Sequence, residues 1–214
     1  MSAPTKSVAI VTMSTRAVRI GPAVTEIVKE IIAPEAAANS ITLSDVDLAT
    51  FKLPVFDEVT VPGMIPDRGS FALPHSLAWS AEIKRHDGYV LVIPEYNYGL
   101  AGGTKNAIDY LLHEWRGKPV VVLTYGIKGG EFASDQANHV LGMMKLRVAK
   151  TRPQLVLAAG AEGGTPDMFL AIAGQLGEAS KESWLKEKSE EIKTAFAELR
   201  ELLDQEPEEV KPHA

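Results

Sequence analysis

Short runs of consecutive apolar residues, many of them β-branched, divide the chain into segments. Four such runs stand out, at residues 8–13, 89–93, 119–124 and 154–158. None of them alternates with polar residues, which is typical of strands that helices cover on both faces of a parallel sheet. A fifth run, at 41–48, is mixed and interrupted by Ser44 and Asp45, as expected for an edge strand.

Between these runs, apolar residues recur every three or four positions, a spacing that predicts helices. The first helix is expected to begin at Pro22 and to end before Pro34. The other stripes lie at 108–117, 133–148 and 184–203, with a weaker one at 76–85. Strands and helices therefore alternate along the chain, with five strands in all.

This alternation predicts an α/β fold of one domain. Right-handed crossovers place helices on both faces of the sheet. We expect a flavodoxin-like three-layer α/β/α sandwich with a five-stranded parallel sheet in the order 2-1-3-4-5. The domain is predicted to span residues 1–203, with a long surface loop at 57–75. Residues 204–214 form an acidic, Pro-containing tail that we expect to be frayed.

Composition excludes several classes of function. The chain has 214 residues, a net charge of −6 and no cysteine, so disulfides, thiolate catalysis and cysteine-ligated metals are excluded. The acidic balance makes nucleic acid an unsuitable partner. The apolar runs are far shorter than the ~18 residues of a membrane span, and the start lacks the apolar core of a signal peptide. We expect a soluble cytoplasmic protein without membrane contact, and no metal site is predicted.

Three loops follow strands at the edge where such sheets bind ligands, next to the point where the strand order reverses. The first loop carries Ser14, Thr15, Arg16 and Arg19 before a helix start. Hydroxyls, guanidinium groups and free helix N–H groups together suit a phosphate. A capped turn with solvated arginines is the alternative interpretation of this loop.

The second and third loops are rich in aromatic residues and glycine. The second, at 94–110, contains Pro94, Glu95, Tyr96, Asn97 and Tyr98 followed by three glycines. Glycine permits close approach of the backbone to a ligand, and tyrosine offers a flat face to a ring system. In the third loop, Tyr125 and Gly126 precede a Gly-Gly pair, whose amides are able to face a ligand edge.

The second loop resembles the signature of the NADPH-dependent FMN reductase family, which includes flavodoxin-fold quinone, azo-dye and chromate reductases. That signature reads approximately P-E-Y-N-x-S/G-x-P-G-x-L-K-N-A-I-D-W. Residues 94–97, Gly99, Gly102 and 105–109 match it in register, while Ala101, Thr104 and Tyr110 depart from it. The segments at 47–58 and 126–130 are also similar to the family. The resemblance covers about residues 7–160.

The resemblance implies a role for each matching residue. Ser14 and Arg16, with Arg19 by position, would hold the FMN phosphate. Residues from Pro94 to Tyr98 would line the isoalloxazine ring, with Glu95, Tyr96 and Asn97 supplying hydrogen bonds to its polar edge. Tyr125 and Gly126 would close over the pyrimidine side. Lys105 and Asn106 are equally well explained as residues that brace the loop.

One departure concerns the first loop. The family usually has G-S-x-R-x-x-S there, whereas this chain has Met13 in place of the glycine and Arg19 in place of the last serine. The change alters the shape of the loop and adds a charge to it. FMN affinity is the property that we expect this change to affect.

The activity that the resemblance implies is transfer of hydride from NADPH through bound FMN to a quinone, flavin, azo dye or metal oxyanion, with ping-pong kinetics. No catalytic side chain is expected, because the flavin carries the redox chemistry. A homodimer or dimer of dimers is implied by the same kinship, with Trp115, Met143 and Met144 as candidate contacts. Packing in the core is the alternative explanation of these three residues.

Two alternatives within flavin chemistry stay open: a flavodoxin-like electron carrier, and a redox-sensing flavin-binding regulator without NADPH turnover of its own. Other classes lack their motifs. The chain has no G-x-S-x-G, no P-loop and no G-x-G-x-x-G after its first strand.

Overall fold

The computed structural model describes residues 5–65, 70–159 and 166–205. Its strands form one parallel sheet in the order β2-β1-β3-β4-β5, with β6 also paired to β4. The strands are β1 (Lys6–Thr12), β2 (Ile41–Asp47), β3 (Gly88–Pro94), β4 (Pro119–Gly126), β5 (Arg147–Val148) and β6 (Gln154–Val156). The predicted flavodoxin-like order is thereby confirmed.

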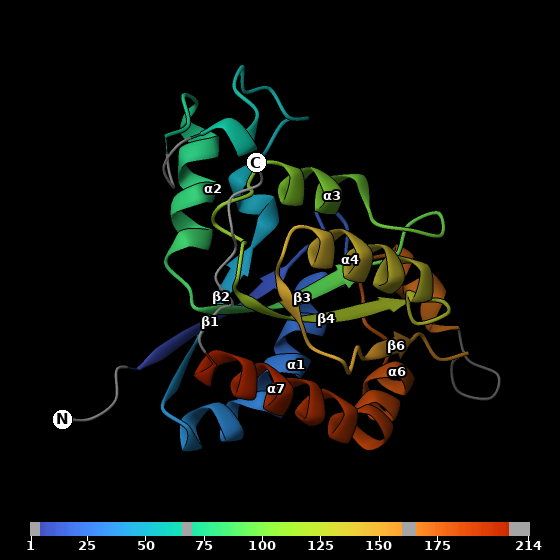
Figure 1. Cartoon of the computed structure of the whole chain (residues 1–214). Helices are drawn as coiled ribbons and strands as arrows, with labels where there is room; N and C mark the ends of the chain where they lie inside the picture. The colour runs from blue at the N-terminus through green and yellow to red at the C-terminus, as the bar shows by residue number, and fades with distance from the viewer. Residues whose placement is uncertain (1–4, 66–69, 160–165, 206–214) are drawn as a thin grey trace.

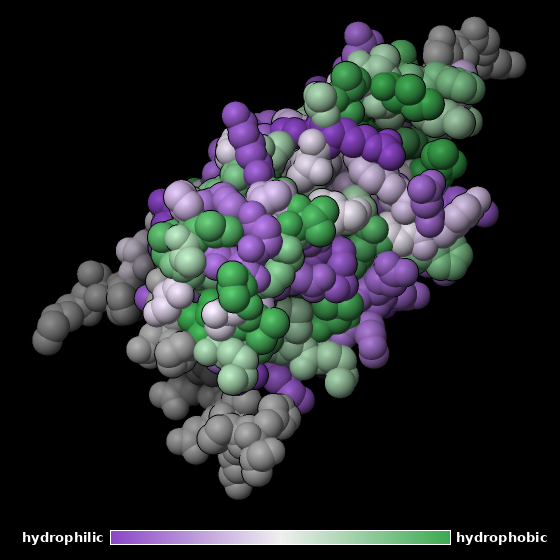
Figure 2. Space-filling model, turned by 90° about the horizontal axis from the view of Figure 1, so that it is seen from above, coloured by the Kyte–Doolittle hydropathy of each residue, from purple (hydrophilic) through white to green (hydrophobic). Residues whose placement is uncertain are grey.

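Helices cover both faces of the sheet (Figure 1), with α1 and α7 on one side and α2, α3 and α4 on the other. The helical segments are α1 (Gly21–Ala38), η1 (Leu48–Phe51), η2 (Pro62–Met64), α2 (Pro74–Lys84), α3 (Gly102–Asp109), α4 (Glu131–Met143), α5 (Asp167–Ile172), α6 (Glu178–Ser183), η3 (Trp184–Lys188) and α7 (Ser189–Asp204). None of the described helices is long and apolar enough to cross a bilayer. Seen from above, the face of α2, α3 and α4 mixes hydrophobic and hydrophilic residues (Figure 2).

Uninterrupted apolar strands supply both layers of the core. All seven residues of β3 are buried. Successive side chains of a strand point to opposite faces, so Val90 and Val92 pack with α1 and α7, whereas Tyr89 and Leu91 pack with the helices of the other layer. This two-sided burial is what the unbroken apolar runs predicted.

The fifth position of the sheet differs from the expectation. We predicted one strand at 154–158, but two short strands, β5 and β6, pair with the beginning and the end of β4. Pro153 lies between them and has no N–H group to donate, so a continuous ladder is interrupted there. Val148, which was expected in a helix, belongs to β5 because α4 ends at Met143.

Two helix boundaries were also predicted wrongly. The first helix does not end before Pro34 but continues to Ala38. Pro34 is exposed, so water is able to satisfy the carbonyl group that its missing N–H leaves unpaired. The stripe at 108–117 is helical only to Asp109, where α3 ends. Beyond it, Trp115 is buried in an irregular turn against Tyr89, with ring centroids 4.9 Å apart, so packing rather than helix periodicity explains the apolar spacing.

Little of the predicted tail falls within the structure. Its first residue, Asp204, is the last residue of α7, and residues 206–214 lie outside the described part of the chain. The predicted surface loop at 57–75 contains η2 and the beginning of α2, and residues 66–69 of it also lie outside.

A buried histidine at the amino end of the sheet makes stability depend on pH. His86 Nδ1 lies 2.8 Å from Ser7 Oγ, and its Nε2 lies 3.1 Å from Glu82 and 3.2 Å from Arg85 Nε. Burial lowers the pKa of His86 below its ordinary value of 6.5, the charges of Arg85 and Lys118 add to this, and Glu82 opposes it. The folded state therefore holds this ring neutral.

The contribution of His86 to the free energy of unfolding is fully present above pH 6.5. It is lost as the pH falls toward the lowered pKa, because the unfolded chain then binds a proton at this residue more readily than the folded chain does. We expect His86→Gln to flatten the fall of Tm between pH 6.5 and about 5. Melting curves of both proteins across this range measure the effect. Parallel curves would show that His86 does not link stability to pH.

Candidate functional site

The three predicted loops meet at the carboxyl edge of the sheet around a cavity of about 430 Å³. Its volume lies within the range of small-molecule and cofactor pockets. The lining residues are Arg16, Val18, Arg19, Ile20, Pro94, Glu95, Tyr96, Tyr125, Gly126, Ile127, Leu157, Met168, Ala171 and Ile172. Seven of the ten predicted site residues are among them. Ser14, Asn97 and Tyr98 do not line the cavity, and the Ser14 hydroxyl lies beside Gly21, next to the lining residue Ile20.

The first loop ends at a helix start that is open to an anion. Helix α1 begins at Gly21 without a capping side chain and without an acidic residue in its first turn. Ser14 Oγ is fully buried against this turn and has no well-formed hydrogen bond in the described part of the chain. A Cβ at residue 21 would lie 2.1 Å from Ser14 Oγ, so only glycine leaves room for the hydroxyl. Free N–H groups and an unsatisfied hydroxyl thus adjoin the cavity.

Tyr125, near the end of β4, reaches the same position with its hydroxyl group. Its hydroxyl also lies beside Gly21 and approaches Ser14. Burial raises the pKa of Tyr125 well above its usual range, and the contact with Ser14 and the charges of Arg19 and Arg16 offset part of that rise. The phenol is therefore a neutral hydrogen-bond donor at physiological pH.

The Arg19 side chain is held by two contacts within the protein. It forms an ion pair with Asp47 at the end of β2, 2.5 Å apart, and its Nη1 donates to the Arg16 carbonyl group. The register of the sheet places Asp47 beside Thr12, directly before the first loop. Arg19 lines the cavity, but its charge is balanced by Asp47. It fixes the loop and adds little net charge for a phosphate.

The second loop begins as a tight hairpin. Tyr96 N–H donates to the Gly99 carbonyl group, and Glu95 bridges to Leu100. Asn97 and Tyr98, between them, both have positive φ angles, of 51° and 60°, as in a type I′ turn. Asparagine suits such a position, whereas tyrosine is strained there.

The two predicted ligand residues at the tip of this hairpin do not line the cavity. Tyr98 is 73% exposed and packs edge-on against Phe132, with ring centroids 5.8 Å apart. Asn97 is exposed at the tip. The Glu95 carboxylate accepts a hydrogen bond from Ala133 N in the first turn of α4, and its own N–H donates to the Tyr125 carbonyl group. Glu95 therefore anchors the hairpin to α4.

Lys105 and Asn106 brace the structure, one of the two roles expected for them. Lys105 pairs with Asp109 at 2.7 Å on the surface of α3. Asn106 donates to the Pro54 carbonyl group and accepts from Phe56 N, which ties α3 to the segment that follows β2.

Sequence reasoning missed the wall formed by α5. Met168, Ala171 and Ile172 project from this helix into the cavity lining, and Leu157 precedes it. The helix has six residues and follows the last recognised loop by about forty positions. A short apolar segment of this length has no periodicity that would assign it to a site. Val18 and Ile127 complete an apolar rim, both more than half exposed.

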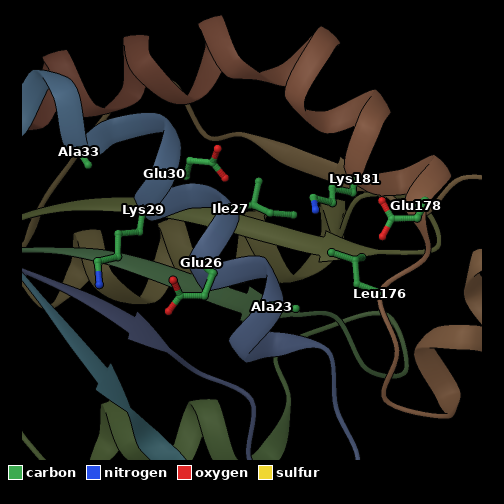
Figure 3. Close-up of a pocket in the computed structure, with 9 residues that line it drawn as sticks. All are labelled: Ala23, Glu26, Ile27, Lys29, Glu30, Ala33, Leu176, Glu178 and Lys181. Atoms are coloured by element: carbon green, nitrogen blue, oxygen red, sulfur yellow. The ribbon is translucent and has the colours of Figure 1, made fainter.

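A larger and more open cavity, of about 740 Å³, lies elsewhere on the surface, between α1 and α6 (Figure 3). Its floor includes Ala23, Ile27 and Leu176, and charged side chains of Glu26 and Lys181 surround it. It contains none of the predicted site residues and lies between two helices. Chemistry and topology together favour the smaller cavity as the functional site.

The fold and this cleft define a flavodoxin-like α/β protein with a cofactor-sized site at the carboxyl edge of its sheet. A family model, NADPH-dependent FMN reductase, matches residues 6–162, and the chain belongs to this family. It is therefore a flavin-dependent NAD(P)H oxidoreductase whose cofactors are FMN and NAD(P)H, which confirms the resemblance.

Similar proteins agree with this assignment. The chain is 42% identical over 201 residues to the NAD(P)H-dependent FMN reductase ntnL of Nectria sp, covering 92% of this chain and 97% of that one. It is 33% identical to the NAD(P)H-dependent FMN reductase C4B3.06c of Schizosaccharomyces pombe, covering 95% and 94%. Among solved structures, the flavoenzyme FerB of Paracoccus denitrificans has a TM-score of 0.60 at 19% identity, with 90% and 97% of the chains covered, which supports the fold.

Proposed function

We propose that the protein passes reducing equivalents from NADPH, through FMN held in the 430 Å³ cavity, to a quinone, flavin, azo dye or metal oxyanion by ping-pong kinetics. The observation that carries the proposal is that all three loops line one cavity with a single apolar rim. Because the loops line one cavity, NADPH and the electron acceptor are expected to occupy it one after the other.

The residues present fit FMN. An uncapped helix start, a buried hydroxyl without a well-formed partner and the Arg16 guanidinium belong to the first loop and the helix that follows it, and together they suit a phosphate. Aliphatic side chains from Ile20, Leu157 and Ile172 line the rest, as a planar ring requires. Phosphate donors and an apolar lining thus adjoin one cavity, which is what a molecule with an anionic tail and a tricyclic ring needs.

Bound FMN supplies the centre that accepts and releases hydride, so the protein needs only to bind, orient and shield. Ser14, Arg16 and the first turn of α1 hold the phosphate. Tyr125 donates a hydrogen bond near it, with its proton retained because burial raises its pKa. The hairpin from Pro94 and the rim formed by Val18 and Ile127 limit access of water and leave one side open to the second substrate.

Two measurements test the proposal. The purified protein is expected to be yellow, or to become so with FMN, and the released cofactor to be identified as FMN. Rapid mixing with NADPH is then expected to bleach the flavin, and initial rates with a quinone to give parallel double-reciprocal lines. If the protein binds FMN but NADPH does not bleach the flavin, the protein is an electron carrier or a regulator. Intersecting lines would exclude a ping-pong mechanism in which the two substrates occupy the cavity in turn.

Assembly and location are finer proposals. A homodimer or dimer of dimers rests on kinship alone, and a cytoplasmic location stays the expectation drawn from the sequence. Of the three residues named for a subunit contact, Trp115 is fully buried and Met144 packs against the core, which leaves Met143, 68% exposed. Sedimentation velocity of the purified protein decides the subunit number.

A further inference from the structure

The most unusual contact in the cavity joins the first loop to the second. The Arg16 guanidinium carbon lies 3.5 Å from the centroid of the Tyr96 ring, so the cation rests on the aromatic face. Both residues line the cavity, and Tyr96 is partly buried. The face that carries Arg16 is not open to a ligand ring in this structure. The two residues therefore act together rather than as separate ligands for phosphate and ring.

Stacking and hydrogen bonding use different parts of a guanidinium group. The flat face contacts the aromatic ring, while the N–H donors point outward in the plane. The Arg16 side chain forms no hydrogen bond or ion pair within the described part of the chain. Its donors are thus free, while one face of the group rests on the Tyr96 ring.

Among the described residues that line the cavity, Arg16 is the cation that no carboxylate pairs with. Arg19 is neutralised by Asp47, and the Glu95 carboxylate is held by Ala133 N. The Arg19 side chain additionally binds the Arg16 carbonyl group, so the backbone beneath the stacked side chain is fixed as well. An anion that enters the cavity finds one available guanidinium fork, already oriented.

We propose that Tyr96 is a positioning residue for Arg16, which makes the site select the phosphate-bearing flavin over riboflavin. Tyr96 acts through the arginine and not as a platform for the flavin ring. The inference rests on the proposed function, because it assumes that a flavin occupies the cavity. It goes beyond that function by naming the contact that sets discrimination between two flavins.

The test compares dissociation constants for FMN and riboflavin, measured by quenching of flavin fluorescence, in Tyr96→Leu and Tyr96→Phe. Loss of the aromatic face is expected to weaken FMN binding about tenfold, within the range of cation–π energies, and riboflavin binding less than about twofold. Tyr96→Phe keeps the face and is expected to bind FMN like the parent. In an Arg16→Ala background, Tyr96→Leu is expected to cause no further loss of FMN affinity.

Equal weakening of both flavins by Tyr96→Leu would overturn the inference and make Tyr96 a ring platform. So would unchanged FMN affinity, or a Phe variant as weak as the Leu variant. If Tyr96→Leu does not fold, Arg16→Lys is the deciding variant, because lysine keeps the positive charge but lacks the planar face and the forked donors of arginine. An Arg16→Lys protein with the FMN affinity of the parent would refute the role of stacking. A parent protein that binds neither flavin would instead refute the proposed function.

Discussion

Replacing Gly21 by alanine is expected to lower the affinity for FMN about 10- to 100-fold, the equivalent of one hydrogen bond to a charged group. The new Cβ would lie 2.1 Å from Ser14 Oγ and 3.0 Å from both Thr12 Cγ2 and the Tyr125 hydroxyl. The serine hydroxyl has to leave its position, and the methyl group covers the open first turn of α1. Titration with FMN, followed by fluorescence, measures the change.

Two control variants distinguish an effect on the FMN site from the effect of adding a methyl group to a helix. Gly142 lies in α4, where an added Cβ would meet no atom of the described chain within 4 Å, so Gly142→Ala is expected to leave FMN affinity unchanged and to stabilise the helix by about 0.5–1 kcal/mol. Ser14→Ala combined with Gly21→Ala relieves the collision but lacks the hydroxyl. If the double variant binds FMN as tightly as the parent, Ser14 has no part in the phosphate site.

The strands and the three loops were predictable because both follow from local patterns. An unbroken apolar run such as 119–124 requires cover on both faces, and a doubly wound order then fixes which loops share an edge. The fifth strand was not predictable from its own composition, since the break depends on how Pro153 meets β4. Helix α1 passes through Pro34 because of the solvent exposure of that residue, which a pattern does not record.

Within the site, it was predictable which loops meet at the cavity, whereas side-chain direction was not. The pairing of Arg19 with Asp47 depends on the register between β1 and β2, two segments thirty-five residues apart along the chain. Tyr98 turns away because two consecutive residues adopt left-handed backbone conformations and Phe132 offers a contact. The stacking of Arg16 on Tyr96 likewise joins two loops that only the folded sheet brings together.

Replacing Asp167 by alanine is expected to destabilise the protein by about 2–3 kcal/mol and to weaken FMN binding at the same time. Asp167 is 3% exposed, and its carboxylate accepts a 2.7 Å hydrogen bond from Ser180 N in the first turn of α6. Ser180 Oγ in turn accepts from Ala158 N, after β6. The carboxylate also packs on Gly177, where a Cβ would lie 2.1 Å from its carbon.

This chain of contacts joins α5, α6 and the end of the sheet, so the cavity wall formed by Met168 and Ile172 depends on it. Without the carboxylate, Ser180 N–H is buried without an acceptor and α5 loses its fixed position.

Asp167→Asn keeps an acceptor oxygen and is expected to lose less than half as much stability as the alanine variant. Glu178→Ala, an exposed change in the same turn of α6, is the matched control. Thermal unfolding with and without FMN measures both effects; a variant at Asp167 that loses stability but binds FMN like the parent would show that α5 is not a wall of the cofactor site.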